Sequence, residues 1–228
     1  DGFGYKKMQG VGFSHARLSI VDLNESRARQ PFESQDGNLM LTTNGELYDY
    51  QRIRADLTSR GSRFITKSDS EIILHLYSDL GFEKMLRHLR GEFAFALFDK
   101  KDDCLYLVRD RFGVKPLYWK IENDVLVFGS ELKVLFAHPE ISRKFDSKGV
   151  YHQLMQTIVP GSTAFEGVKQ VKPGHVIAIT RQDGRFKVTE KKYWDMPFPE
   201  ISERDNQKDE SYWIDAVREK LLESVQLR

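Results

Sequence analysis

Alternating apolar and polar positions divide the first part of the chain into strands and helices. Residues 11–23 (VGFSHARLSIVDL) are predicted to be extended, because β-branched and aromatic residues are frequent there. Residues 38–43 (NLMLTT) predict a second strand, and apolar residues then recur every three or four positions between residues 50 and 57, which predicts a helix. The tripeptide 44–46 (Asn-Gly-Glu) is therefore predicted to be a corner from strand to helix, although Asn-Gly usually marks a hairpin turn.

A further helix is predicted within residues 66–81 (TKSDSEIILHLYSDLG). Ser68 and Glu71 have the spacing of a capping box at its start. Gly81 is placed to close it.

From residue 92 onward the pattern predicts strands joined by short polar turns. The segments EFAFALFD, DCLYLVRD, PLYWKIE and VLVFGSE predict an antiparallel meander. EFAFALF is apolar at both alternating sets of positions, which indicates a strand covered on both faces. Short helices around residues 131–139 and 147–155 and a hairpin over 174–194 follow, so the expected class is α+β.

Composition changes near residue 194. Residues 194–211 contain two prolines and many charges, as a linker does, and residues 212–228 have helical spacing. We therefore expect one domain over residues 1–195, and over 196–228 a linker with the first helix of another domain. Because the chain begins with Asp and stops inside an apparent helix, we expect it to be a piece of a longer polypeptide.

Overall composition is that of an ordinary globular protein, with 40% hydrophobic and 30% charged residues. The 35 basic and 34 acidic side chains give a net charge of +1, which favours neither nucleic acid nor a membrane surface as partner. No apolar run approaches the roughly 20 residues of a membrane span, and no signal peptide is recognisable. A single cysteine cannot form an internal disulfide, which agrees with the cytoplasm as the expected location.

Four polar residues stand where local propensity does not require them. Arg17 can end a strand as a solvated charge, or its planar fork can bind a carboxylate. Asn44 can belong to a turn, or its amide and the N–H of the following glycine can donate to one oxyanion. Glu46 and Asp69 can be favourable charges at helix starts, or partners of an ammonium group. One guanidinium and two carboxylates match the zwitterion of a free α-amino acid.

Other polar features have simpler interpretations. Residues 109–119 (RDRFGVKPLYW) suit a turn before a strand, although four charges within seven residues exceed what a turn needs. Cys104 lies in a strand-like segment without a His or basic neighbour, which favours a structural thiol over a nucleophile. The six histidines lack metal-ligand spacing and no phosphate-binding glycine loop is present, so no metal or cofactor is expected in this domain.

Taken together, these stretches resemble the glutamine-hydrolysing domain of asparagine synthetases, in the class II glutamine amidotransferase family. They run in order as HARLSIVDL, QPF, NGELYDYQRIRADL, SDSEIILHLY, LRGEFAFALFD, VRDRFGVKPLYW, FGSELKVL, VKPGHVIAI and YWD. The resemblance implies an N-terminal-nucleophile hydrolase fold, an αββα sandwich of antiparallel sheets. Its first strand is expected to be missing, because Asp1 matches a position roughly thirty residues into the family pattern.

Roles for individual residues follow from the resemblance. Arg17 would hold the α-carboxylate of glutamine, and Glu46 and Asp69 would hold its α-ammonium. Asn44 and Gly45 would form the oxyanion hole. The backbone of four further residues would line the same pocket: Leu18, Ser19, Ile20 and Val21.

The family's nucleophile is an N-terminal cysteine whose own amine acts as the base. Neither that residue nor the family's ATP-binding SGGxDS loop is found in this sequence. The resemblance implies a glutamine-dependent asparagine synthetase, in which this domain hydrolyses glutamine to ammonia. A synthetase domain of the same polypeptide would use ATP and Mg²⁺ to amidate aspartate. We expect the chain alone to be inactive, and a homodimer is compatible with the resemblance.

Two alternatives stay open. The parent protein can be a related enzyme that forms an amide or lactam on another carboxylate, or this part can be a non-catalytic amidotransferase-like domain. Retention of Arg17, Asn44, Gly45, Glu46 and Asp69 counts against both. The sequence does not identify the acyl acceptor.

Overall fold

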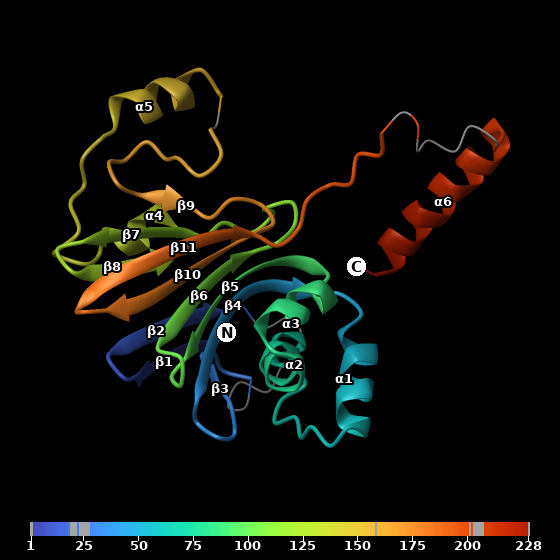
Figure 1. Cartoon of the computed structure of the whole chain (residues 1–228), viewed down its shortest axis with the longest axis horizontal. Helices are drawn as coiled ribbons and strands as arrows, with labels where there is room; N and C mark the ends of the chain where they lie inside the picture. The colour runs from blue at the N-terminus through green and yellow to red at the C-terminus, as the bar shows by residue number, and fades with distance from the viewer. Residues whose placement is uncertain are drawn as a thin grey trace. The chain divides into compact units, whose positions relative to one another are not determined.

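The computed structural model describes residues 2–18, 22, 28–157, 159–200, 202 and 208–227 (Figure 1). The chain forms two compact units, Asp1–Trp194 and Asp195–Arg228. In the second unit the described structure is mainly α6 (Glu210–Gln226), whose first turn is capped by Asp209, the acceptor of a hydrogen bond from the Tyr212 N–H. No helix of the described part of the chain is long and apolar enough to cross a membrane.

A six-stranded antiparallel sheet forms the centre of the first unit. Its strands lie in the order β11-β10-β6-β5-β4-β3. Their bounds are β3 (Phe32–Glu33), β4 (Leu39–Leu47), β5 (Gly91–Asp99), β6 (Cys104–Arg109), β10 (His175–Gln182) and β11 (Arg185–Lys192).

Helices cover one face of this sheet. They are α1 (Tyr50–Ser59), the 3₁₀ turn η1 (Asp69–Glu71), α2 (Ile72–Leu80) and α3 (Phe82–His88), and α1 to α3 gather beside the strands in Figure 1. Ile53 and Leu57 of α1 are buried in one core cluster with Phe93 and Phe95 of β5. Burial of these apolar side chains is the main force that holds the helices on the sheet.

Strands cover the opposite face. A hairpin of β1 (Gly2–Met8) and β2 (Val11–Arg17) and a three-stranded sheet of order β8-β7-β9 share a second core cluster with the central sheet, which includes Phe13, Met40, Phe98 and Trp119. The remaining bounds are β7 (Tyr118–Glu122), β8 (Val125–Gly129), β9 (Lys169–Gln170), α4 (Leu132–Leu135), which packs on β7 and β8, and α5 (Ser147–Leu154). The predicted α+β class, with antiparallel strand layers and helices, is confirmed.

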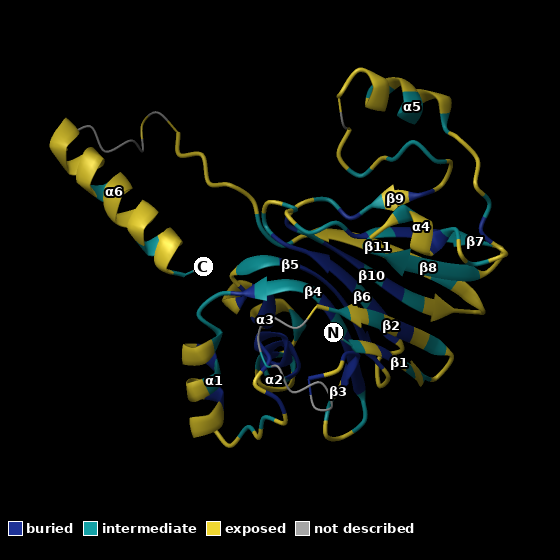
Figure 2. Cartoon of the chain, turned by 180° about the vertical axis from the view of Figure 1, so that it is seen from behind, coloured by how far each residue is buried: buried dark blue, intermediate teal, exposed yellow. Residues whose placement is uncertain are grey.

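Strand β5 is covered on both faces, as predicted from its apolar pattern. Every residue from Phe93 to Asp99 is buried (Figure 2). Since β5 pairs with β4 on one side and β6 on the other, it is a fully enclosed strand of the sheet.

The predicted meander is wrong. β5 and β6 form one hairpin in the central sheet, whereas β7 and β8 form another in the three-stranded sheet, and the free edge of β6 pairs with β10. The Asp110 carboxylate accepts backbone N–H bonds from Phe112, Val114 and Lys115 at 3.0–3.1 Å. This turn carries the chain from one sheet to the other, so the strand after it cannot return beside β6.

The predicted corner at residues 44–46 is also wrong. These residues belong to β4, where Asn44, Gly45 and Glu46 lie opposite Ala94, Phe93 and Glu92 of β5. Gly45 has φ +137°, and a Cβ there would lie 2.0 Å from the carbonyl oxygen of Glu92. Glycine is therefore needed for close approach of two strands rather than for a turn. The chain turns after Leu47 instead.

Neither of the two bonds of the predicted capping box between Ser68 and Glu71 is formed, although Ser68 still caps the helix start. The Ser68 hydroxyl does accept from the Ser70 N–H. Glu71, however, accepts from the N–H groups of Ile65 and Thr66, while the Ser68 N–H donates to the Thr66 hydroxyl. The intervening 3₁₀ turn directs Glu71 back to the loop, which explains the difference. Gly81 ends α2, as predicted.

Removing the Asp110 carboxylate tests how much the turn at residues 110–115 stabilises the fold. Asp110 is 0% exposed and its oxygens bind three N–H groups, so Asp110→Ala should lower the free energy of unfolding by about 3 kcal/mol. Urea unfolding measures the change. Asp103→Asn, in an exposed turn with φ +44° that asparagine tolerates, is the matched control. Equal stability of the Asp110→Ala protein would show that the turn forms without these bonds.

Candidate functional site

One large cavity, of about 1010 Å³, lies over the central sheet and is lined by β1, β2, β4, β5 and β8 and by the segments around residues 69 and 138. Side chains alternate between the faces of a strand, so Thr42, Asn44 and Glu46 of β4 share the face of the buried Met40. The neighbouring positions of β5 are Ala96 and Ala94. These small residues leave room for the cavity above the sheet.

The four polar residues with sequence-predicted roles and Gly45 all line this cavity. Arg17, Asn44, Gly45, Glu46 and Asp69 come from three separate segments of the chain. Leu18 lines it too and is 70% exposed. The predicted lining residues 19–21 (Ser19, Ile20 and Val21) lie outside the described residues.

Arg17 is the last residue of β2. Its Nη2 donates to the carbonyl oxygen of Asp22 at 2.8 Å, and the Asp22 carboxylate accepts from the Lys67 N–H at 2.6 Å. Asp22 thus connects the arginine to the loop that precedes Asp69. A guanidinium presents several N–H donors in one planar fork, which matches an anion such as a carboxylate.

Glu46 and Asp69 form the acidic side of the cavity. Asp69 is 6% exposed, and its Oδ2 accepts from the Leu47 N–H at 2.7 Å, next in sequence to Glu46. Its Oδ1 lies 3.4 and 3.5 Å from the hydroxyls of Ser68 and Ser70. The Glu46 carboxylate has no hydrogen bond or ion pair to any residue that the structure describes. Two carboxylates held in one place favour a cationic ligand.

Across the ladder, Glu46 lies directly opposite Glu92. Glu92 accepts from the Tyr48 hydroxyl at 2.9 Å and lies 3.6 Å from Nζ of Lys115. Like charges on opposite residues repel. The Tyr48 hydroxyl and the Lys115 ammonium both stabilise the charge of Glu92, and neither forms a hydrogen bond or ion pair with Glu46. This leaves Glu46 as the carboxylate suited to a ligand.

Asn44 occupies the middle of the cavity floor. Its Nδ2 lies 3.3 Å from the hydroxyl oxygen of Ser130, which follows β8 on the opposite wall. A long, weak bond of this kind is readily exchanged for one to a ligand. A ligand oxygen near Asn44 would meet an amide donor.

Sequence reasoning did not identify His15 as a cavity residue. His15 lies two positions before Arg17 on the same face of β2, and its Nδ1 lies 3.0 Å from the Thr42 hydroxyl. Burial, with a further contribution from the Arg17 charge, lowers the pKa of His15 from 6.5 to about 4. The ring is therefore neutral at pH 7. The period-two spacing from Arg17 was the signal that could have found it.

Ser130 and Lys115 also line the cavity and were not identified. They come from segments far from Asn44 in sequence, and no local pattern connects them to it. Of the charges in residues 109–115, Arg109 has a structural role, because its guanidinium donates to carbonyl oxygens including that of Val171 at 2.8 Å. Only Lys115 of that group lies at the cavity wall.

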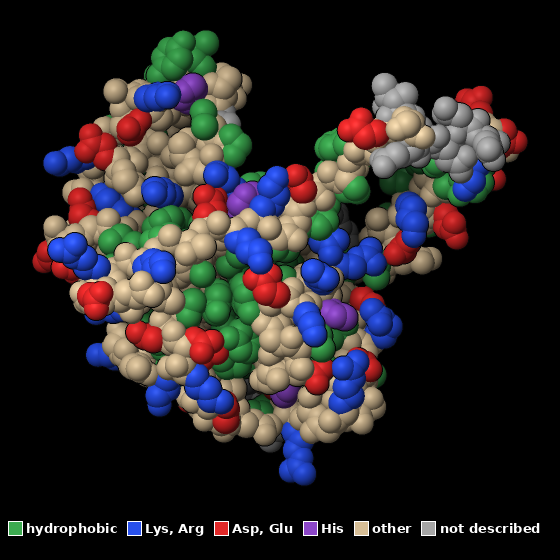
Figure 3. All heavy atoms as spheres, in the orientation of Figure 1, with side chains coloured by type: hydrophobic (Ala, Val, Ile, Leu, Met, Phe, Trp, Pro, Cys, Tyr) green, Lys and Arg blue, Asp and Glu red, His purple; other side chains and the backbone are tan. Residues whose placement is uncertain are grey.

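Cys104 lies in β6 and is 4% exposed. Burial raises the pKa of its thiol, which lowers the fraction of the group that is present as the nucleophilic thiolate. Among the described residues no group of three or more His, Cys, Asp or Glu could hold a metal ion. On the face drawn in Figure 3, basic and acidic side chains are interspersed.

Residues 1–194 match a protein-family model described as "Glutamine amidotransferase domain". The chain is similar to the amidase chry2 of Gibberella zeae, with 37% identity over 96% of this chain and 31% of that protein. It is also similar to the amidase chyE of Penicillium rubens, with 36% identity over 100% of this chain and 32% of that protein. Asparagine synthetase (glutamine-hydrolyzing) 1 of Bacillus subtilis is 35% identical over 99% of this chain and 34% of that protein. The chain therefore spans about a third of the length of these relatives.

Solved structures show the same fold. The glutamine phosphoribosylpyrophosphate amidotransferase of B. subtilis complexed with ADP and GMP superposes with a TM-score of 0.55 at 22% identity, over 80% of this chain and 35% of that chain. A structure titled as the allosteric regulatory enzyme of purine biosynthesis gives a TM-score of 0.56 at 22% identity, with the same coverage.

Gly45→Ala tests the close approach of β4 and β5. The added methyl would meet the Glu92 carbonyl in a backbone conformation that L-residues rarely adopt, so we expect the free energy of unfolding to fall by about 3 kcal/mol or more. Urea unfolding measures it. Gly2→Ala, with no atom within 4 Å of the new methyl, serves as control. A Gly45→Ala protein as stable as this control would refute the steric argument.

His15→Gln tests the neutral histidine. In the unfolded chain His15 binds a proton near pH 6.5 but in the folded protein only near pH 4, so its contribution to stability is complete above pH 6.5 and is lost as pH falls toward 4. The stability of the wild type relative to His15→Gln should therefore drop across this window by up to about 3 kcal/mol. Urea unfolding of both proteins at several pH values measures this difference in the free energy of unfolding. The contributions of the carboxylates cancel, because both proteins contain them. A difference independent of pH would contradict the lowered pKa.

Proposed function

Because the chain belongs to the glutamine amidotransferase domain family over residues 1–194, we propose that its cavity binds L-glutamine for the transfer of the amide nitrogen. The observation that carries this proposal is the convergence of Arg17, Asn44, Gly45, Glu46 and Asp69 on one cavity. Their charges and donors match the three polar groups of glutamine. Glutamine-dependent relatives support the same substrate class.

Each residue has a role in this proposal. The Arg17 fork binds the α-carboxylate, since a guanidinium matches a carboxylate with two parallel bonds. Glu46 and Asp69 bind the α-ammonium. The Asn44 amide and the Gly45 N–H stabilise the oxyanion that forms when the side-chain amide carbon is attacked. The backbone of residues 18–21 completes the pocket.

The attacking group is a cysteine thiolate in this mechanism. An amine base takes the thiol proton, the thiolate bonds to the amide carbon, and the C–N bond breaks as the nitrogen takes up that proton and leaves as ammonia. Water then hydrolyses the thioester to glutamate and the free thiol. Cys104 does not supply that thiolate, because it is buried in β6. We therefore expect the chain alone to hydrolyse no glutamine, and the whole protein to provide the nucleophile.

For the whole protein we propose a glutamine-dependent asparagine synthetase, supported by the B. subtilis asparagine synthetases at 34–36% identity. The ammonia then amidates aspartate in an ATP-dependent synthetase domain of the same polypeptide. ATP and Mg²⁺ would serve that domain, and no step in the cavity of this chain is assigned to them. A cytoplasmic location and a homodimer remain expectations.

A second candidate is an enzyme that forms an amide or lactam on another carboxylate. The amidases of G. zeae and P. rubens, at 37% and 36% identity over almost the whole chain, favour it. Product analysis of the full-length protein with aspartate and with other carboxylates distinguishes the two candidates.

Arg17→Met tests the glutamine site in the full-length protein. Loss of a charged hydrogen bond to the α-carboxylate should raise KM for glutamine at least about 30-fold. Ammonia release is measured at varied glutamine concentrations. Amidation with added ammonium salt should persist, because that route bypasses the cavity. Arg185→Met, an exposed arginine of β11, is the control. An unchanged KM in Arg17→Met would exclude Arg17 from the site, and no ammonia from the wild type would refute the proposal.

A further inference from the structure

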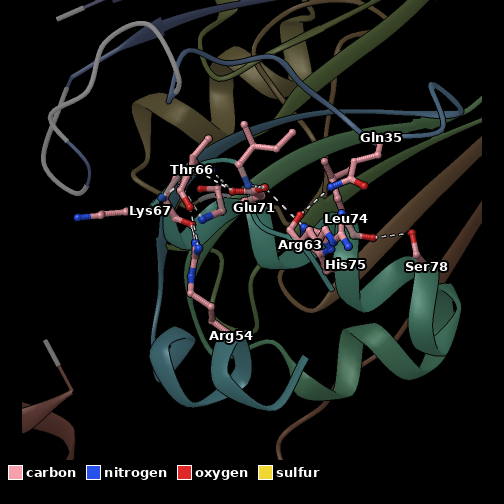
Figure 4. A network of polar contacts seen from close by, with 12 residues as sticks. Gln35, Arg54, Arg63, Thr66, Lys67, Glu71, Leu74, His75 and Ser78 are labelled. Atoms are coloured by element: carbon pink, nitrogen blue, oxygen red, sulfur yellow. Dashed lines mark hydrogen bonds and ion pairs between the residues drawn. The ribbon is translucent and has the colours of Figure 1, made fainter. Parts of the chain in front are cut away.

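Arg54 of α1, which is partly buried, and the buried Glu71 of η1 belong to one network of polar contacts (Figure 4). Neither residue lines the cavity. Both instead bind the loop of residues 65–68, which leads directly into Asp69. Their effect on a ligand therefore acts through Asp69.

Arg54 holds this loop by two backbone carbonyl groups. Its Nη1 donates to Thr66 O and its Nη2 to Ser68 O, each at 2.7 Å. The guanidinium also lies 4.2 Å above the centre of the Phe64 ring. A planar fork that binds the carbonyls on both sides of Lys67 fixes the orientation of the peptides just before Asp69.

Glu71 holds the same loop by its amide groups. Its carboxylate accepts from Ile65 N at 2.7 Å, from Thr66 N at 2.8 Å and from the Thr66 hydroxyl at 2.6 Å. Burial raises the pKa of Glu71, but hydrogen bonds from His75, Ile65 and Thr66 outweigh it and lower the pKa below its ordinary value. Glu71 is therefore ionised at neutral pH and remains an acceptor for all three donors.

Asp69 is thus fixed from two sides. The loop held by Arg54 and Glu71 sets its backbone, and the Leu47 N–H of β4 binds its carboxylate. Ser68, Asp69, Ser70 and Glu71 are all less than 7% exposed. A shift of the loop would move the Asp69 carboxylate away from Glu46 and weaken a site that needs both charges.

Resting on the proposed function, we propose that Arg54 is a positioning residue that sets the place of Asp69 and thereby the preference of the cavity for ligands with an α-ammonium group. A ligand without that group leaves two carboxylates close together with no counter-charge, which is unfavourable. The preference depends on how closely Asp69 and Glu46 are held. Arg54 does not itself line the cavity and reaches it through the carbonyl of Ser68, next to Asp69.

The test compares L-glutamine with glutaramate, which has the same carboxylate and side-chain amide but no amine. Ammonia release by the full-length protein, measured at varied ligand concentration, gives KM as the apparent affinity for both ligands. We expect the wild type to prefer L-glutamine, and Arg54→Met to weaken L-glutamine binding at least about tenfold while glutaramate binding changes less than about twofold. Arg54→Lys should weaken L-glutamine binding less than Arg54→Met does, because the lysine ammonium can still bind one of the two carbonyls.

Arg52→Met is the matched control, since Arg52 lies on the same helix with its side chain 74% exposed and pairs with Asp49. Its preference should equal that of the wild type. If Arg54→Met does not fold, Arg54→Lys and Glu71→Gln carry the comparison, with the same selective loss expected. Equal losses for both ligands, or no loss for either, in folded variants would overturn the positioning role. A wild type that releases ammonia from neither ligand would instead overturn the proposed function itself.

Discussion

The close backbone contact between Gly45 of β4 and Glu92 of β5 is the constraint on which the cavity depends. A side chain at position 45 would meet the Glu92 carbonyl oxygen, so only glycine allows the two strands to stay paired through residue 47. Because pairing continues, Asn44 and Glu46 share one face of the sheet. The Leu47 N–H is then placed where the Asp69 carboxylate binds it. The polar floor of the cavity is thus a property of a strand rather than of a flexible turn.

The distribution of charge follows from this ladder. Pairing brings Glu46 opposite Glu92, and Tyr48 and Lys115 offset the charge of Glu92. Asp69 adds a second carboxylate beside Glu46, while the Arg17 guanidinium belongs to a different strand at the cavity wall. A cavity with separated acidic and basic groups binds a zwitterion better than an ion of one sign, because each end of the ligand meets its opposite charge. This is the electrostatic basis of the glutamine proposal.

Local sequence patterns predicted α1, α2, α4, α5 and α6, the β10–β11 hairpin and the full burial of β5, whereas the short helix α3 was not predicted. The prediction from sequence was wrong where one residue type is compatible with two different local structures. A glycine at position 45 is compatible with a turn and with a close contact between two strands. The position of the partner strand β5 determines which of the two forms. The meander prediction failed because three backbone N–H groups donate to the Asp110 carboxylate and redirect the chain, and the sequence does not show which donors a carboxylate in a turn binds. The residue types of the site were predictable, but neighbours such as Ser130 come from remote segments.

Similarity over this chain does not separate the two candidate activities of the whole protein. Relatives named as amidases are 36–37% identical to it, and B. subtilis asparagine synthetases are 34–36% identical. Proteins with different names are therefore similar to this chain to nearly the same degree. An ammonia-supplying site has no contact with the carboxylate that receives the nitrogen, so its residues need not change when that carboxylate changes. The choice of nitrogen donor and the choice of acyl acceptor are therefore separate problems of recognition, and the cavity of this chain addresses the first.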